Sequence, residues 1–141
     1  MGPKLEKQVC YALYSTSGVV TQAYRSLLKP FNLTYPQFVV MMALWHKDKV
    51  SVTELAGAVG LSKPTMTPLL KRLELLNYIS RNFEPGDERQ KCVALTPLGT
   101  DLASKTEEVA QQALCATGLT NREAEQLIAL CQKIKIHLEE D

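Results

Sequence analysis

The spacing of apolar residues predicts a mostly helical chain. Over about 5–28, apolar side chains recur every three or four positions, as in an amphipathic helix, and Pro30 ends the pattern. Thr34, followed three residues later by Gln37, forms the capping-box signal that opens a second helix over about 35–46.

Two more capping signals follow closely. Ser51 opens a short third helix over about 52–59, and Ser62 opens a fourth over about 63–76. Asn77 suits the left-handed residue that ends a helix.

The period then changes from helix to strand. Residues 78–83 and 90–95 alternate between apolar and polar side chains, and the turn cluster 84–88 separates them, so a β-hairpin is expected. A short helix, a tight turn, a longer helix and a hairpin describe a winged helix-turn-helix.

Two further helices are expected after the hairpin. Thr96 caps a fifth helix ending near residue 115, and Thr120 caps a sixth over about 121–138. The expected fold class is therefore mainly α with a small β-hairpin wing, in a single domain over 1–141.

Composition narrows the class of protein. The chain has 141 residues, 45% of them apolar, which is enough for one domain with a real core. It has no apolar run of membrane-spanning length, and its polar start has no signal-peptide pattern, so a cytoplasmic protein is expected. The four cysteines form no CxxC pair, and His46 and His137 lack ligand spacing, so neither a metal nor a cofactor is expected.

Positive charge gathers on the expected fourth helix although the net charge is only +1. Over 55–82 the cations are Lys63, Lys71, Arg72 and Arg81, against the single anion Glu74. Phosphates attract such a segment, and the attraction should weaken strongly with salt. The alternative is a solvated helix with a few lysines.

The hairpin tip has its own charged residues. Asp87 and Arg89 can pair across the turn, which would leave Arg89 able to enter a minor groove. The alternative is an exposed ion pair worth about 0–1 kcal/mol.

These segments resemble a known family. Asp-Glu-Arg at 87–89, followed by Leu-Thr-Pro-Leu-Gly at 95–99, resembles the wing signature of the MarR family of bacterial transcriptional regulators. Residues 33–38 and 65–73 resemble its organic-hydroperoxide-sensing branch, OhrR, and the resemblance covers nearly the whole chain.

The resemblance implies a homodimer that binds pseudo-palindromic operator DNA, with half-sites about 34–36 Å apart. It implies terminal dimerisation helices over about 1–34 and 97–141 and a DNA-binding lobe over about 35–96. With the charge pattern, it gives these candidate DNA contacts: Ser62, Lys63, Thr65, Thr67, Lys71, Arg72, Asp87 and Arg89.

Cys10 is the candidate reactive thiol. Tyr14 lies one turn along the same helical face, but Tyr24, on that face too, is about 21 Å away along a straight helix. Tyr24 could therefore reach only the Cys10 of a partner chain whose first helix runs in the opposite sense. Tyr35 is a third candidate hydroxyl.

Phenolic hydroxyls that donate to sulfur favour the thiolate, which attacks a peroxide and becomes a sulfenic acid. The alternative is that Cys10 is a small core residue with tyrosines packed around it. The resemblance to OhrR makes Cys10 the sensor, with Tyr14, Tyr24 and Tyr35 around it.

The resemblance also implies a resolving cysteine near the end of the fifth helix of the other subunit, where Cys115 lies. Cys131 and Cys92 are weaker candidates, and a small thiol could cap Cys10 instead. Candidates to line an apolar peroxide pocket are Phe38, Met41, Met42 and Trp45, whose alternative role is core packing.

The resulting hypothesis is a repressor that organic hydroperoxide releases from DNA. Three alternatives remain: a repressor of the same fold that senses a noncovalent ligand, a thiol peroxidase, and an interaction module that binds no DNA. An enzyme is not expected, because the sequence places no arginine near Cys10 to polarise a peroxide.

Overall fold

A computed structural model describes residues 1–84 and 87–139, with the side chains of 1–82 and 92–139. Its elements run in this order: a 3-10 turn (Leu5–Lys7), α1 (Val9–Leu28), a 3-10 turn (Lys29–Phe31), α2 (Tyr35–His46), β1 (Val50–Ser51), α3 (Val52–Val59), α4 (Lys63–Leu75), β2 (Ile79–Glu84), β3 (Asp87–Leu95), α5 (Pro97–Ala116) and α6 (Asn121–Glu139). The predicted fold class is confirmed.

The predicted caps begin these helices. The Thr34 hydroxyl accepts from the backbone N–H of Gln37, whose side-chain oxygen accepts from the backbone N–H of Thr34 at 2.9 Å. Ser62 and Thr96 cap α4 and α5, and Asn77 is left-handed with φ of 64°. Helix boundaries are therefore fixed mainly by residues within three positions of each start.

Two details differ from the prediction. The first helix begins at Val9 rather than near Leu5, because the chain before it forms only a 3-10 turn. The hairpin gains a third strand, since β1 pairs antiparallel with β3 through Val50 and Val93.

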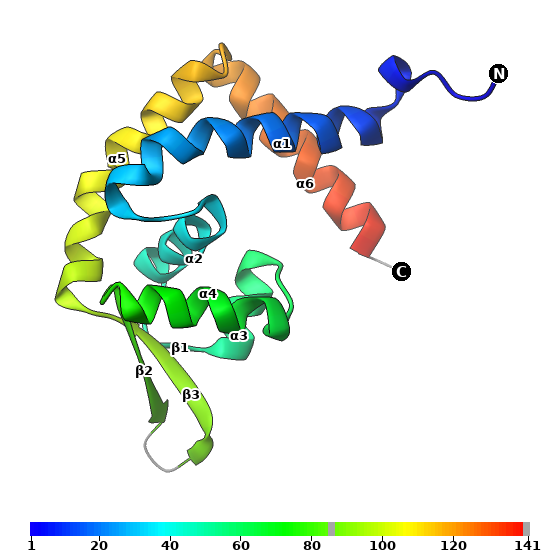
Figure 1. The fold of residues 1–141 in the computed structure, drawn as a ribbon. Helices are drawn as coiled ribbons and strands as arrows, with labels where there is room; N and C mark the ends of the chain where they lie inside the picture. The colour runs from blue at the N-terminus through cyan, green and yellow to red at the C-terminus, as the bar shows by residue number, and fades with distance from the viewer. Residues whose placement is uncertain (85–86, 140–141) are drawn as a thin grey trace.

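The core joins α2, α3, α4 and the sheet. Phe38, Met41, Leu44, Met66 and Leu70 are among its almost wholly buried side chains. In Figure 1, α3, α4 and the strands lie below α1 and form one compact lobe.

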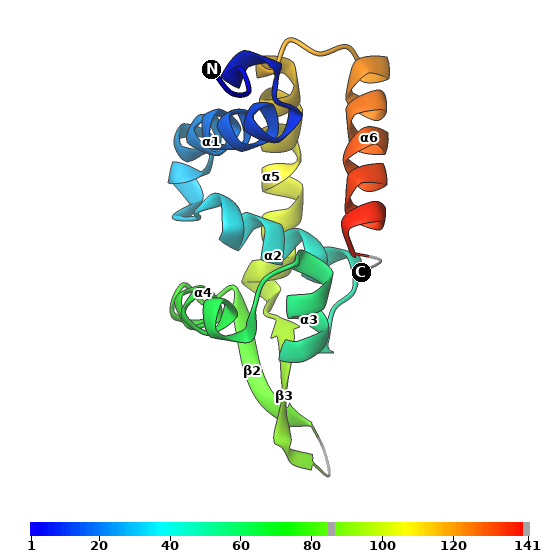
Figure 2. The ribbon, with the colours of Figure 1, turned by 90° about the vertical axis from the view of Figure 1, so that its right-hand side faces the viewer.

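The terminal helices are thinly covered. Leu28 is the only buried residue of α1, and α6 has none. Figure 2 shows α1 and α6 on opposite sides of α5, joined to the lobe through α5 and α2. No helix in residues 1–84 and 87–139 is long and apolar enough to cross a membrane.

Candidate redox and DNA-binding sites

The first turn of α4 presents short polar side chains. The Ser62 hydroxyl lies 2.8 Å from that of Thr65 and accepts from the Thr65 backbone N–H at 3.4 Å. The Thr67 hydroxyl donates to the carbonyl of Lys63 at 3.1 Å. Free N–H groups and the positive end of the helix dipole at such a turn favour phosphate.

Burial divides α4 into two faces. Met66, Leu70 and Leu73 are fully buried against the core and fix the helix on the lobe. The opposite face leaves exposed all six predicted α4 contacts: Ser62, Lys63, Thr65, Thr67, Lys71 and Arg72.

Glu74, the single anion of residues 55–82, is already paired. Glu74 accepts from Arg81 at 3.3 Å, and that guanidinium is mostly covered. Among the side chains that the structure describes, Lys63, Lys71 and Arg72 have no acidic partner. The exposed face of α4 is therefore cationic, as a phosphate-binding surface requires.

The wing side chains Asp87 and Arg89 lie outside the described residues. Their ion pair and the minor-groove contact of Arg89 stay predictions.

The predicted thiol site is divided between the two ends of α1. Cys10, the second residue of α1, is exposed, and Tyr14 is 80% exposed. At the other end, the rings of Tyr24 and Tyr35 meet edge to face with centroids 4.5 Å apart. The structure thus brings the two tyrosines together, while Cys10 and Tyr24 lie about 21 Å apart along α1.

Within this pair, the Tyr24 phenol is protonated at neutral pH. Burial, and secondarily the neighbouring Tyr35, raise the pKa of the Tyr24 phenol above its ordinary value of 10.0. A phenol in this state donates a hydrogen bond, which is the property needed beside a thiolate.

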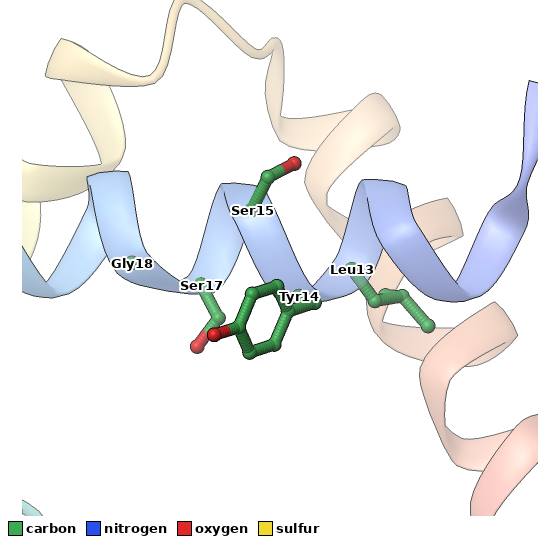
Figure 3. Close-up of a pocket in the computed structure, with 5 residues that line it drawn as sticks. All are labelled: Leu13, Tyr14, Ser15, Ser17 and Gly18. Carbon is green, nitrogen blue, oxygen red and sulfur yellow. The ribbon is translucent and has the colours of Figure 1, made fainter. Parts of the chain in front are cut away.

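Between the two halves, α1 carries a depression. It is lined by Leu13, Tyr14, Ser15, Ser17 and Gly18 (Figure 3). Gly18 has open space where a side chain would stand, so another backbone can approach α1 there.

The other three cysteines are also free. Cys115 is exposed at the penultimate position of α5, whereas Cys131 in α6 and Cys92 in β3 are half-buried. The structure brings none of them into a disulfide.

The four predicted peroxide-pocket residues all lie on α2, and their role in binding peroxide stays a prediction. Phe38 and Met41 are buried in the core, Met42 is partly exposed, and the Trp45 indole N–H donates to the carbonyl of Gly99 at 2.9 Å. None of the four lines the depression on α1 or the groove between α1, α2 and α6. Core packing accounts for Phe38 and Met41 in the single chain.

A groove missed from the sequence lies between α1, α2 and α6, with a volume of about 740 Å³. Its sequence signal was the apolar stripe of α6, a helix with no buried residue in the described part of the chain. Lining residues include Val9, Leu13, Val20, Tyr35, Leu127 and Cys131. Within the described residues, no three potential ligands gather as a metal site would need.

Comparison with known proteins agrees with this architecture. Residues 33–91 match the MarR family. TtmR, a transcriptional regulator of Methylorubrum extorquens, is 38% identical over 88% of this chain, which spans 64% of the length of TtmR. The organic hydroperoxide resistance transcriptional regulator of Bacillus subtilis is 35% identical over 88% of this chain and 82% of its own length.

Solved structures of AbfR are similar over most of both chains. AbfR of Staphylococcus epidermidis has a TM-score of 0.83 at 29% identity and covers 97% of this chain and 95% of its own. Reduced AbfR bound to DNA gives 0.79 at 28% identity, covering 96% and 93%, and disulfide-formed AbfR gives 0.63 at 27%, covering 96% and 90%. The chain therefore belongs to the MarR family of DNA-binding transcriptional regulators.

Proposed function

We propose that this regulator is a homodimeric repressor that organic hydroperoxide releases from its operator. The observation that carries the proposal is the divided site: Cys10 and Tyr14 at one end of α1, Tyr24 and Tyr35 at the other. A second chain placing its own α1 antiparallel would bring the two halves together twice.

The surface of the terminal helices supports such a dimer. Val9, Val19 and Tyr14 of α1 and Ile128 and Ile136 of α6 are each more than half exposed in the single chain. Large apolar side chains in such numbers need a cover, and a two-fold dimer supplies it. We infer from this that about 1–34 and 97–141 dimerise, while about 35–96 read DNA.

The position of the two-fold axis follows from the pairing. If Cys10 meets the partner's Tyr24 across antiparallel helices, the helices cross at the midpoint, Ser17. Gly18 adjoins this point and lies in the depression of Figure 3, where another helix backbone fits.

The chemistry balances as two steps. The Cys10 thiolate attacks the distal peroxide oxygen, the O–O bond breaks, and an alkoxide leaves to be protonated as the alcohol while sulfur becomes a sulfenic acid. The Cys115 thiol of the partner then attacks that sulfur, forming a disulfide and releasing water. The peroxide is thereby reduced, and two thiols are oxidised.

Disulfide formation would move the lobes. The bond requires Cα atoms about 4.4–6.8 Å apart, so a larger separation in the reduced dimer forces the helices to shift. The two α4 helices would then no longer span one turn of DNA. The likeness to AbfR supports this step, because its reduced DNA-bound form fits this chain better than its disulfide form.

The test is electrophoresis without reductant after treatment with cumene hydroperoxide. We expect a band of doubled mass in the native chain and in the control Cys92→Ser, and its loss in both Cys10→Ser and Cys115→Ser. A doubled band that persists without Cys115 contradicts the pairing. A monomer carrying only a small-thiol adduct indicates the one-cysteine route instead.

The groove favours a second candidate, a repressor that binds an apolar ligand noncovalently. Its volume of about 740 Å³ suits a small organic molecule. In that case Cys10→Ser would leave induction intact, whereas the redox proposal requires induction to be lost.

A further inference from the structure

A row of aromatic rings leads from the tyrosine pair into the lobe. Phe38 lies between Tyr24 and Trp45, with ring centroids 6.0 Å and 6.1 Å away. Phe38 is 1% exposed, so the middle of the row is packed on all sides, while Tyr24 and Trp45 at its two ends are half-buried. Close-packed rings transmit a displacement rather than absorb it, because the interior has no free space.

The row ends on the first turn of α5. The Trp45 indole donates its hydrogen bond to the carbonyl of Gly99, the third residue of that helix. Gly99 in turn lies directly against the backbone of Tyr78, since a Cβ on Gly99 would stand 2.0 Å from the Tyr78 carbonyl oxygen. Tyr78 immediately precedes β2, so this contact adjoins the wing and the end of α4.

A second link joins Tyr78 to the 3-10 turn that follows α1. The Tyr78 hydroxyl donates to the carbonyl of Phe31, the last residue of that turn, at 3.0 Å. Burial raises the pKa of the Tyr78 phenol, so the hydroxyl keeps its proton at neutral pH. Thr96 binds the same region: its backbone N–H donates to the carbonyl of Tyr78 at 3.1 Å, and its hydroxyl donates to the carbonyl of Asn77 at 2.7 Å.

We propose that Phe31, Trp45, Tyr78 and Gly99 form a joint that carries a displacement of the Tyr24–Tyr35 pair to α4 and the wing. Trp45 and Tyr78 are its positioning residues: neither lies among the candidate DNA contacts, and each ties two elements together. The inference rests on the proposed redox function, which supplies the displacement.

The geometry favours a rigid-body response. Gly99 accepts the hydrogen bond from Trp45 of α2, and Tyr78 donates the one to the 3-10 turn after α1. The backbones of Gly99 and Tyr78 meet so closely that no Cβ fits between them. Such packed contacts change by discrete steps, so a small shift at the tyrosines would turn the lobe as a unit.

The test compares DNA affinity before and after cumene hydroperoxide in variants that lose one hydrogen bond and keep a ring. Trp45→Phe and Tyr78→Phe should bind DNA when reduced and still form the disulfide. The ratio of oxidised to reduced Kd should fall about three- to tenfold below that of the native chain.

The control is Thr106→Val. Among the residues that the structure describes, its buried hydroxyl bonds within α5 alone, to Leu102 at 2.9 Å and Ala103 at 3.2 Å, so its loss should leave the ratio unchanged. If Trp45→Phe fails to fold, the ratio of oxidised to reduced Kd is measured on Tyr78→Phe alone, because Tyr78 is only half-buried.

Two results would overturn the inference. If both ring variants keep the native ratio while Cys10→Ser loses all response, the joint carries no coupling and the redox function stands. If the native chain itself keeps its DNA under hydroperoxide, the redox function fails, and the joint fails with it.

Discussion

Gly99 is, among the glycines that the structure describes, the one with no room for a side chain. Its Cα faces the Tyr78 carbonyl so closely that an added methyl would lie 2.0 Å from the oxygen, and both partners are backbone. Gly99→Ala should therefore lower the free energy of unfolding by about 1–3 kcal/mol, as overpacking does. Chemical denaturation measures this.

Gly57 provides the matched control. It lies on an exposed face of α3 with nothing near its missing Cβ, so Gly57→Ala should raise the free energy of unfolding by about 0.5–1 kcal/mol. Equal stability of the two variants would contradict the close contact at Gly99.

The Tyr24 hydroxyl makes a prediction at high pH. Its folded-state pKa is raised, so the stability that it contributes is complete below the unfolded value of about 10 and is lost as pH rises through the folded value. In a titration followed by ultraviolet absorbance, Tyr24→Phe should remove one tyrosine that ionises above pH 10. If the ionisation step that Tyr24→Phe removes from the titration lies below pH 10, the burial of Tyr24 is contradicted.

At the scale of elements, α4 makes the electrostatic prediction. Lys71→Gln should weaken binding to all duplexes alike and reduce the slope of log K against log salt by about 0.9, the share of one phosphate contact. Lys105→Gln, an exposed lysine of α5, is the control and should leave the slope unchanged. Identical slopes for the two variants would remove Lys71 from the interface.

The elements also show how far the sequence predicts the fold. The caps at Thr34, Ser62 and Thr96 were predictable because each depends on residues within three positions. The strand β1 was not, since two residues are too short to show an alternating pattern. The partner of Trp45 was hidden too, because Gly99 lies 54 positions away in sequence.

At the scale of the whole molecule, the candidate site was predictable only as a list of residue types. Spacing along α1 showed that Cys10 and Tyr24 share a face, and the structure adds that Tyr24 pairs with Tyr35 instead of with Cys10. The groove beside α6 escaped prediction because it depends on how three helices are placed in space.

The whole molecule is the proposed dimer, in which one thiol from each chain controls the spacing of two lobes. In that dimer a small chemical change at Cys10 would act through the terminal helices, and the spacing of the two α4 helices would amplify it. We therefore propose that this one sulfur controls DNA binding.

The most direct measurement follows fluorescence anisotropy of a labelled duplex, selected in vitro with the reduced protein, as cumene hydroperoxide is added. We expect the native chain to release the duplex and dithiothreitol to restore binding, while Cys10→Ser binds throughout. Release by Cys10→Ser on the same addition would contradict this proposal.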